Sequence, residues 1–199
     1  MRRVCLLLLV AGTASARVIM IPVIARECSD EKTWGDVMKC VEPHGHAKLE
    51  KSLPHARLVR LTRERDENSG LYLFVENKGW QLGGMSEYAG ELLGFDNPTF
   101  GGHAVYRYDM GITEHIGNSG EQTVIRHEQV YCTGTGYRCT TVMVACDVLA
   151  AGKAIETFRG TVSWHQRHLR IAGDRTHAGG ECAQAEEVDL MFPETELDQ

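Results

Sequence analysis

Histidine is the residue type through which this chain could most readily do chemistry, and it occurs nine times. Four loose groups stand out by their spacing: His44 with His46, His165 with His168, His127 with Glu128, and His177 with Asp174. A metal site needs three or four converging ligands, and the sequence holds no H-E-x-x-H motif. We therefore expect scattered histidines and no cofactor. Two alternatives stay open: a hydrolase with a histidine-based site, and a metal-binding module using His44 and His46.

A possible serine nucleophile lies in the middle of the chain. The segment Gly117-Asn118-Ser119-Gly120 resembles the loop around the nucleophilic serine of chymotrypsin-like proteases. It departs from that family, since Asn118 stands where Asp is usual and Glu121 where Gly is usual, and no histidine follows an Ala-Ala pair. A serine nucleophile needs a positioned base and an oxyanion hole, whereas Asn-Ser-Gly is common in turns. We interpret this segment as a hairpin turn.

The N-terminus has the layout of a secretory signal peptide. A basic start is followed by an apolar run over residues 4–11 and by Ala14-Ser15-Ala16. We predict a signal peptide of residues 1–16. A second apolar run over residues 18–25 leaves open cleavage after Ala25, or one uncleaved anchor from 4 to 25. The anchor would place Arg17 near the bilayer centre, at a cost of roughly 2.5–3.5 kcal/mol, so we expect no stable membrane span.

Cysteine usage agrees with export. Removal of residues 1–16 takes away Cys5 and leaves an even number, as expected of disulfides in an exported chain. Six cysteines allow fifteen connectivities, and no C-x2-C zinc spacing is present. Local spacing favours three pairs: Cys28 with Cys40 around a short helix, Cys132 with Cys139 at the mouth of a glycine-rich hairpin, and Cys146 with Cys182.

The hydrophobic pattern predicts a mainly β fold. Alternating or β-branched runs mark strands at 57–62, 71–76, 80–83 and 105–110, then at 123–132, 137–149, 153–164 and 168–172. The last four predict an antiparallel meander. Residues 86–94 fit a helix or a strand, and Ser29 or Asp30 is a candidate helix cap. We expect one domain over residues 17–180, an antiparallel sandwich or partly open barrel with one or two short helices, held by disulfides.

Charge is unevenly distributed along the chain. The net charge is −6, and loss of Arg2 and Arg3 with the signal peptide would lower it further. An acidic balance argues against a nucleic-acid partner. Residues 47–65 are mainly basic, whereas residues 181–199 form an acidic C-terminal segment without Lys or Arg. The two segments can be solvated surfaces, or they can attract each other or meet a charged surface.

The sequence favours a protein without catalysis. With no recognisable catalytic constellation, we expect an exported protein, periplasmic or extracellular, that works as a binding or structural module. Its partner would be a protein, a glycan or a surface component. Four aromatic residues could form a sugar- or peptide-binding surface, although strand aromatics more often belong to the core: Trp80, Tyr106, Tyr108 and Trp164.

Overall fold

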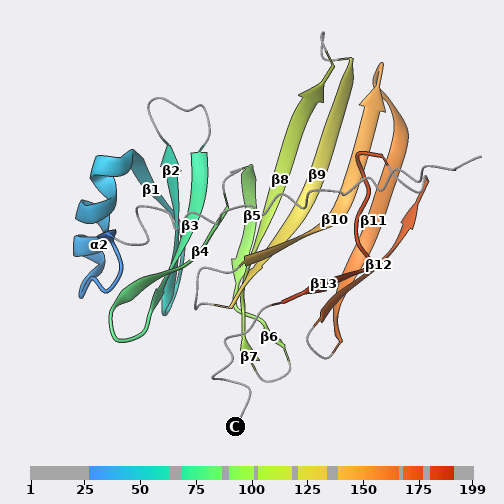
Figure 1. Cartoon of the computed structure of the whole chain (residues 1–199). Coiled ribbons are helices and arrows are strands. Elements are labelled where there is room, and N and C mark those ends of the chain that lie inside the picture. Colours follow the sequence, from blue (N-terminus) through green and yellow to red (C-terminus); the bar gives the residue numbers. More distant parts are fainter. Residues whose placement is uncertain are drawn as a thin grey trace, which may run out of the picture.

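The described part of the chain forms two large antiparallel β-sheets, and a short helix covers the outer side of the smaller one (Figure 1). The computed structural model describes residues 27–62, 69–86, 90–100, 103–117, 121–133, 139–165, 168–176 and 180–190. The predicted signal peptide, Ser119 and His177 lie outside these ranges. The predicted mainly β, disulfide-supported fold is confirmed.

The smaller sheet is an up-and-down meander. Its strands follow chain order: β1 (His46–Leu53), β2 (Ala56–Thr62), β3 (Ser69–Glu76) and β4 (Trp80–Ser86). Strands β3 and β4 pair through the tight turn at residues 77–79 that the sequence predicted. The strands β2 and β3 have apolar residues on both faces, because one face meets the helix layer and the other meets the larger sheet.

The larger sheet has seven strands and contains the predicted meander. In spatial order the strands are β13 (Glu187–Asp189), β12 (His168–Arg175), β11 (Lys153–His165), β10 (Cys139–Ala150), β9 (Gln122–Cys132), β8 (Tyr106–Ile116) and β5 (Glu91–Asp96). A separate two-stranded ribbon consists of β6 (Thr99–Phe100) and β7 (His103–Ala104). The described part of the ambiguous 86–94 segment is therefore strand, not helix.

The single α-helix among the described residues is α2 (Trp34–Val41), followed by a 3-10 turn, η1 (Glu42–His44). The expected cap at Ser29 or Asp30 was wrong, because Thr33 is the N-cap and its hydroxyl accepts a hydrogen bond from the Asp36 N–H. The backbone at positions 30 and 31 instead pairs with Trp80 of β4, and this pairing delays the start of the helix.

Two packed interfaces hold the three layers together. Val37 and Val41 of α2 pack on the outer face of the smaller sheet against residues such as Phe74 and Leu82. The inner face of that sheet packs Leu58, Leu71 and Leu73 against the larger sheet. A further core lies between β10, β11 and the C-terminal segment, where Phe158, Leu169 and Leu190 are buried. The described part of the acidic C-terminal segment is thus attached to the larger sheet.

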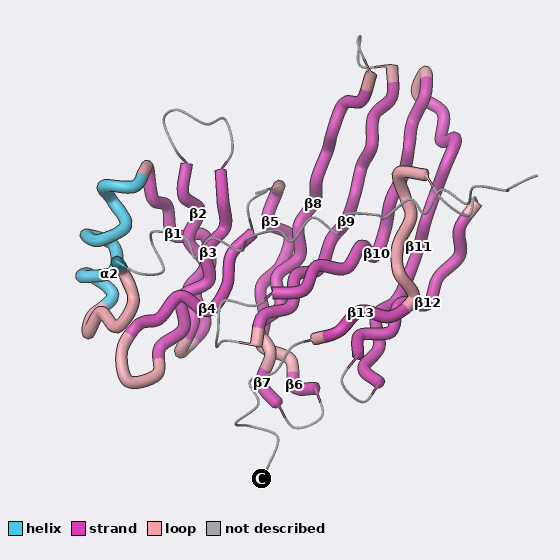
Figure 2. The backbone as a smooth tube through the Cα atoms, in the orientation of Figure 1, coloured by secondary structure: helices cyan, strands magenta, loops and turns pink. Residues whose placement is uncertain are grey.

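Three disulfides join the pairs that the local spacing favoured. Cys28–Cys40 ties the chain before α2 to the helix, and Cys132–Cys139 links directly opposed residues of β9 and β10. Cys146–Cys182 fixes the segment before β13 against β10. Figure 2 shows this segment as a loop running alongside the strands of the larger sheet. The bridges therefore join parts of different layers or strands.

Candidate binding site

Cross-strand register gathers a row of side chains on one face of the larger sheet. Glu91 of β5 lies opposite Gly111 of β8, which lies opposite His127 of β9, which in turn lies opposite Ala145 of β10. Directly opposed residues of an antiparallel pair share a face, with their Cβ atoms about 5 Å apart. Four strands therefore contribute one continuous row, in which two of the four side chains are very small.

The small side chains leave a hollow in this face. Gly111 and Ala145 flank His127, so neither neighbouring strand places a large side chain directly opposite the imidazole, and the hollow has a volume of about 530 Å³. Its rim is apolar, because Leu93 and Ile125 are among the few large hydrophobic side chains that remain exposed, at 51% and 41% respectively. A cavity that combines apolar walls with a few polar groups is the usual form of a ligand site.

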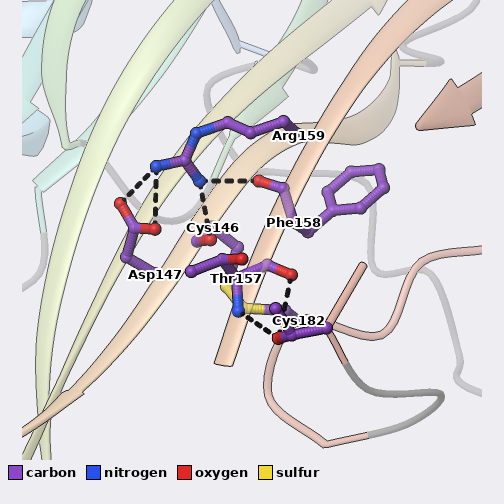
Figure 3. A network of polar contacts seen from close by, with 7 residues as sticks. Cys146, Asp147, Thr157, Phe158, Arg159 and Cys182 are labelled. Atoms are coloured by element: carbon purple, nitrogen blue, oxygen red, sulfur yellow. Dashed lines mark hydrogen bonds and ion pairs between the residues drawn. A yellow bond between two sulfur atoms is a disulfide. The ribbon is translucent and has the colours of Figure 1, made fainter. Parts of the chain in front are cut away.

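Asp147 lines the hollow next to Ala145, and its negative charge is paired with the positive charge of Arg159. The Arg159 guanidinium donates to both carboxylate oxygens of Asp147, at 2.8 and 2.7 Å. The same guanidinium donates to the backbone carbonyls of Cys146 and Phe158 at 3.0 and 2.7 Å. Figure 3 shows Arg159 and Asp147 reaching toward each other on the side of the strands opposite the Cys146–Cys182 disulfide. Arg159 thus has its donors engaged within the protein.

Two polar atoms on this face are buried without a hydrogen-bond partner in the part of the chain that the structure describes. They are Nε2 of His127 and Oδ1 of Asp109. Asp109 lies two residues before Gly111 on β8, so it shares the face of the hollow. Buried polar atoms are nearly always hydrogen-bonded in native proteins. Both atoms belong to residues on the face of the hollow and are closed to solvent in this arrangement, so a new partner could reach them only after a side chain turns.

The opposite face of the same strands carries a separate charged group. Arg126 donates to Glu114 at 2.7 Å and to Glu181 at 3.1 Å. Burial raises the pKa of Glu128, which shares this face; the positive charge of Arg126 lowers it and the charge of Glu114 raises it. Adjacent residues on a strand point in opposite directions, so His127 and Glu128 serve different environments.

The other histidine groups do not converge on a site. His44 forms an ion pair with Glu27, with Nε2 3.1 Å from the carboxylate, and His168 pairs with Asp189 of β13. His165 lies opposite His168 at the end of the β11–β12 hairpin. Among the described residues, no three His, Cys, Asp or Glu side chains are arranged to hold a metal ion.

The candidate aromatic surface is mostly core. Trp80 and Tyr108 are buried, and Tyr106 and Trp164 pack against buried clusters. Trp34 and Trp80 also enclose the Arg57 guanidinium, at 4.7 and 4.5 Å from the ring centroids. These aromatic residues therefore stabilise the layers of the fold.

Comparison with models of known families finds no match, and neither does comparison with curated proteins or with solved structures. Within the described ranges, no helix has the length and apolar character of a membrane span. The hollow must therefore be interpreted from its own chemistry.

Sequence reasoning singled out only one residue of the hollow, His127. Glu91, Gly111 and Asp147 were not predicted, because nothing in their local sequence distinguishes them. Their meeting depends on the register of four strands, including bulges at Leu92/Gly94 and Met143/Ala145. A regular alternation without those bulges would put different side chains on the face.

Proposed function

We propose that this is an exported binding protein whose ligand occupies the hollow on the larger sheet. The observation that carries the proposal is the buried, unpartnered Nε2 of His127 within a hollow of about 530 Å³ with an apolar rim. A ligand that enters would contact the exposed side chains of Leu93 and Ile125, and it would pair with Nε2 of His127 after the imidazole turns toward the hollow. Burying both the apolar surface and the missing hydrogen bond favours binding.

Export is supported by the three disulfides and by the signal-like N-terminus. Disulfides persist in oxidising compartments such as a periplasm or the extracellular space, and are rare in reducing ones. A chain that needs three bridges is suited to work there. The binding role is supported by the geometry of the hollow, which combines an apolar rim with a few polar groups such as Glu91 and His127.

The proposal is tested by nuclear magnetic resonance of isotope-labelled protein against a panel of small metabolites, sugars and short peptides. We expect at least one compound to cause saturable shifts of the amide signals of Gly111, Ile125, His127 and Ala145. A Gly111→Val variant should abolish these shifts, because the added side chain occupies the hollow. A Cβ at Gly111 would meet nothing closer than 3.6 Å, so the first carbon of the new side chain fits, and the dispersion of the amide signals will show that the fold is kept.

Ala172→Val is the control, since it places the same valine side chain at an exposed position of β12 in the same sheet. The control should bind like the wild type. Absence of shifts at the hollow with every compound would contradict the proposal. Conversion of a compound during the titration, lost in His127→Gln, would replace it by the alternative of a hydrolase with a histidine-based site.

A further inference from the structure

Among the described residues around the hollow, some negatively charged side chains lack ion-pair partners, whereas the positively charged ones have them. Glu91 lines it, and the part of the chain that the structure describes contains no ion-pair partner for this carboxylate. Asp109 adds a second negative charge on the same face, with one carboxylate oxygen buried and unpartnered. Both groups are acceptors of hydrogen bonds when ionised.

The two arginines near the hollow already have partners within the protein. Arg159 is held by Asp147 and two carbonyls, and the side chain of Arg126, on the opposite face of the strands, is held by Glu114 and Glu181. An anionic ligand would therefore have to displace an internal carboxylate before it met a guanidinium. A cationic ligand would meet Glu91 without displacing anything.

The apolar side chains at the rim indicate which kind of chemical group should be attached to the positive charge of the ligand. Leu93 and Ile125 expose apolar atoms beside Glu91 and His127, and such surfaces match an alkyl chain. A neutral imidazole accepts at Nε2 when Nδ1 carries the proton. An ammonium group has three donors and can bond to Nε2 and to a carboxylate together.

We infer that the hollow binds an ammonium group carried on an apolar arm, with Glu91 accepting its hydrogen bonds, Leu93 and Ile125 contacting the arm, and His127 Nε2 adding a further acceptor once its imidazole turns toward the ligand. This inference rests on the proposed function and adds the chemical class of the ligand. An alkylamine and the side chain of a lysine in a peptide share this chemistry.

Three probes of equal length separate charge from apolar contact: n-hexylammonium, hexanol and hexanoate. In the nuclear magnetic resonance titration we expect hexylammonium to bind at the hollow more tightly than the other two. Glu91→Gln should weaken its binding about five-fold, the upper range for a solvent-exposed ion pair. Glu186→Gln removes the same charge from an exposed residue beyond β12, and should leave binding unchanged.

Arg159→Gln gives the sharpest test, because it releases the Asp147 carboxylate into the hollow. We expect hexylammonium to bind about two- to five-fold more tightly to this variant. An anion site that uses Arg159 would lose affinity instead. The Arg159 side chain is 58% exposed, so its replacement should leave the fold intact, which the dispersion of the amide signals will show.

A short peptide with one lysine among alanines, compared with the same peptide carrying norleucine, identifies the source of the ammonium group. Tighter binding of the lysine peptide than of hexylammonium assigns the site to a peptide partner, and the reverse assigns it to a free amine.

If hexanoate or hexanol binds as tightly as hexylammonium or more tightly, the inference is overturned and the proposed function still stands. No shift at the hollow with any of these probes also overturns it, and only failure of the wider compound panel would remove the proposed function.

Discussion

Glu128 illustrates how one carboxyl group can oppose folding at neutral pH. Burial raises its pKa, so the native state binds a proton more readily than the unfolded chain does. Above this raised pKa the native protein must hold a partly desolvated carboxylate, which costs stability. Below the ordinary pKa the group is protonated in both states and the cost disappears. Stability contributed through this residue therefore falls as the pH rises through its raised pKa.

Replacement of this residue should stabilise the protein at neutral pH. We expect Glu128→Gln to increase the free energy of unfolding at pH 7 by less than about 1 kcal/mol, because water still screens the partly buried carboxylate. The gain should fade as the pH is lowered through the raised pKa of Glu128 and vanish in acid. Urea unfolding across this pH range measures it, with the exposed Glu186→Gln as control. A loss of stability at pH 7 would show that the charge on Glu128 is needed for its interaction with Arg126.

The sequence was least informative about the roles of individual residues. It pointed to His127 and Glu128 together, but the strand sends these side chains to opposite faces. It pointed to Ser29 and Asp30 as helix caps because their side chains suit that role, but the backbone of Asp30 and Glu31 is hydrogen-bonded to Trp80, and Asp30 adopts a positive φ of 70° that no N-cap uses. In both cases a contact from a distant strand decided the outcome.

Strands and hairpins were predicted far better, because their signals are local. The meander from β9 to β12 follows from alternating and β-branched residues separated by glycine-rich turns. The pairing of Cys132 with Cys139 follows from their places at the mouth of one hairpin. The seven-stranded order could not be predicted, since β5 joins β8 across the intervening β6–β7 ribbon.

Contact between the sheets depends on a glycine facing this hairpin disulfide. A Cβ added at Gly84 of β4 would lie 2.0 Å from Cys139 Sγ and 2.8 Å from Cys132 Sγ. We expect Gly84→Ala to lower the free energy of unfolding by about 1–3 kcal/mol, since the bridge must shift or the sheets must separate. Denaturant unfolding measures this change.

A double-mutant cycle attributes the cost to the bridge. In a background carrying Cys132→Ala and Cys139→Ala, the added methyl group of Gly84→Ala should cost much less, because the sulfur atoms that it meets are gone. Gly111→Ala is the control for adding a methyl group to a strand glycine, since its nearest contact would be an ordinary 3.6 Å. An equal cost in both backgrounds would place the strain of Gly84→Ala elsewhere.

At the scale of the whole molecule, the three disulfides close loops of very different length. Cys132 and Cys139 are 7 residues apart, Cys28 and Cys40 are 12 apart, and Cys146 and Cys182 are 36 apart. Closing a longer loop removes more entropy from the unfolded chain, and the loop-entropy model gives about 2, 3 and 4 kcal/mol in that order. The longest loop spans β11 and β12, and its bridge holds the segment that leads to the edge strand β13.

Pairwise replacement of the cysteines by alanine should therefore destabilise the protein in a fixed order. We expect the loss of Cys146–Cys182 to lower the free energy of unfolding most and the loss of Cys132–Cys139 to lower it least. Both sulfur atoms of the longest bridge belong to buried residues, so lost packing increases its effect further. Denaturant unfolding of the three double variants measures the order, and an intact-mass comparison with and without reductant first verifies that the two remaining bridges have formed. Equal losses of stability in the three variants would show that loop closure in the unfolded chain is not the main contribution of these bridges. The packing that each bridge brings to its layer would then account for the losses instead.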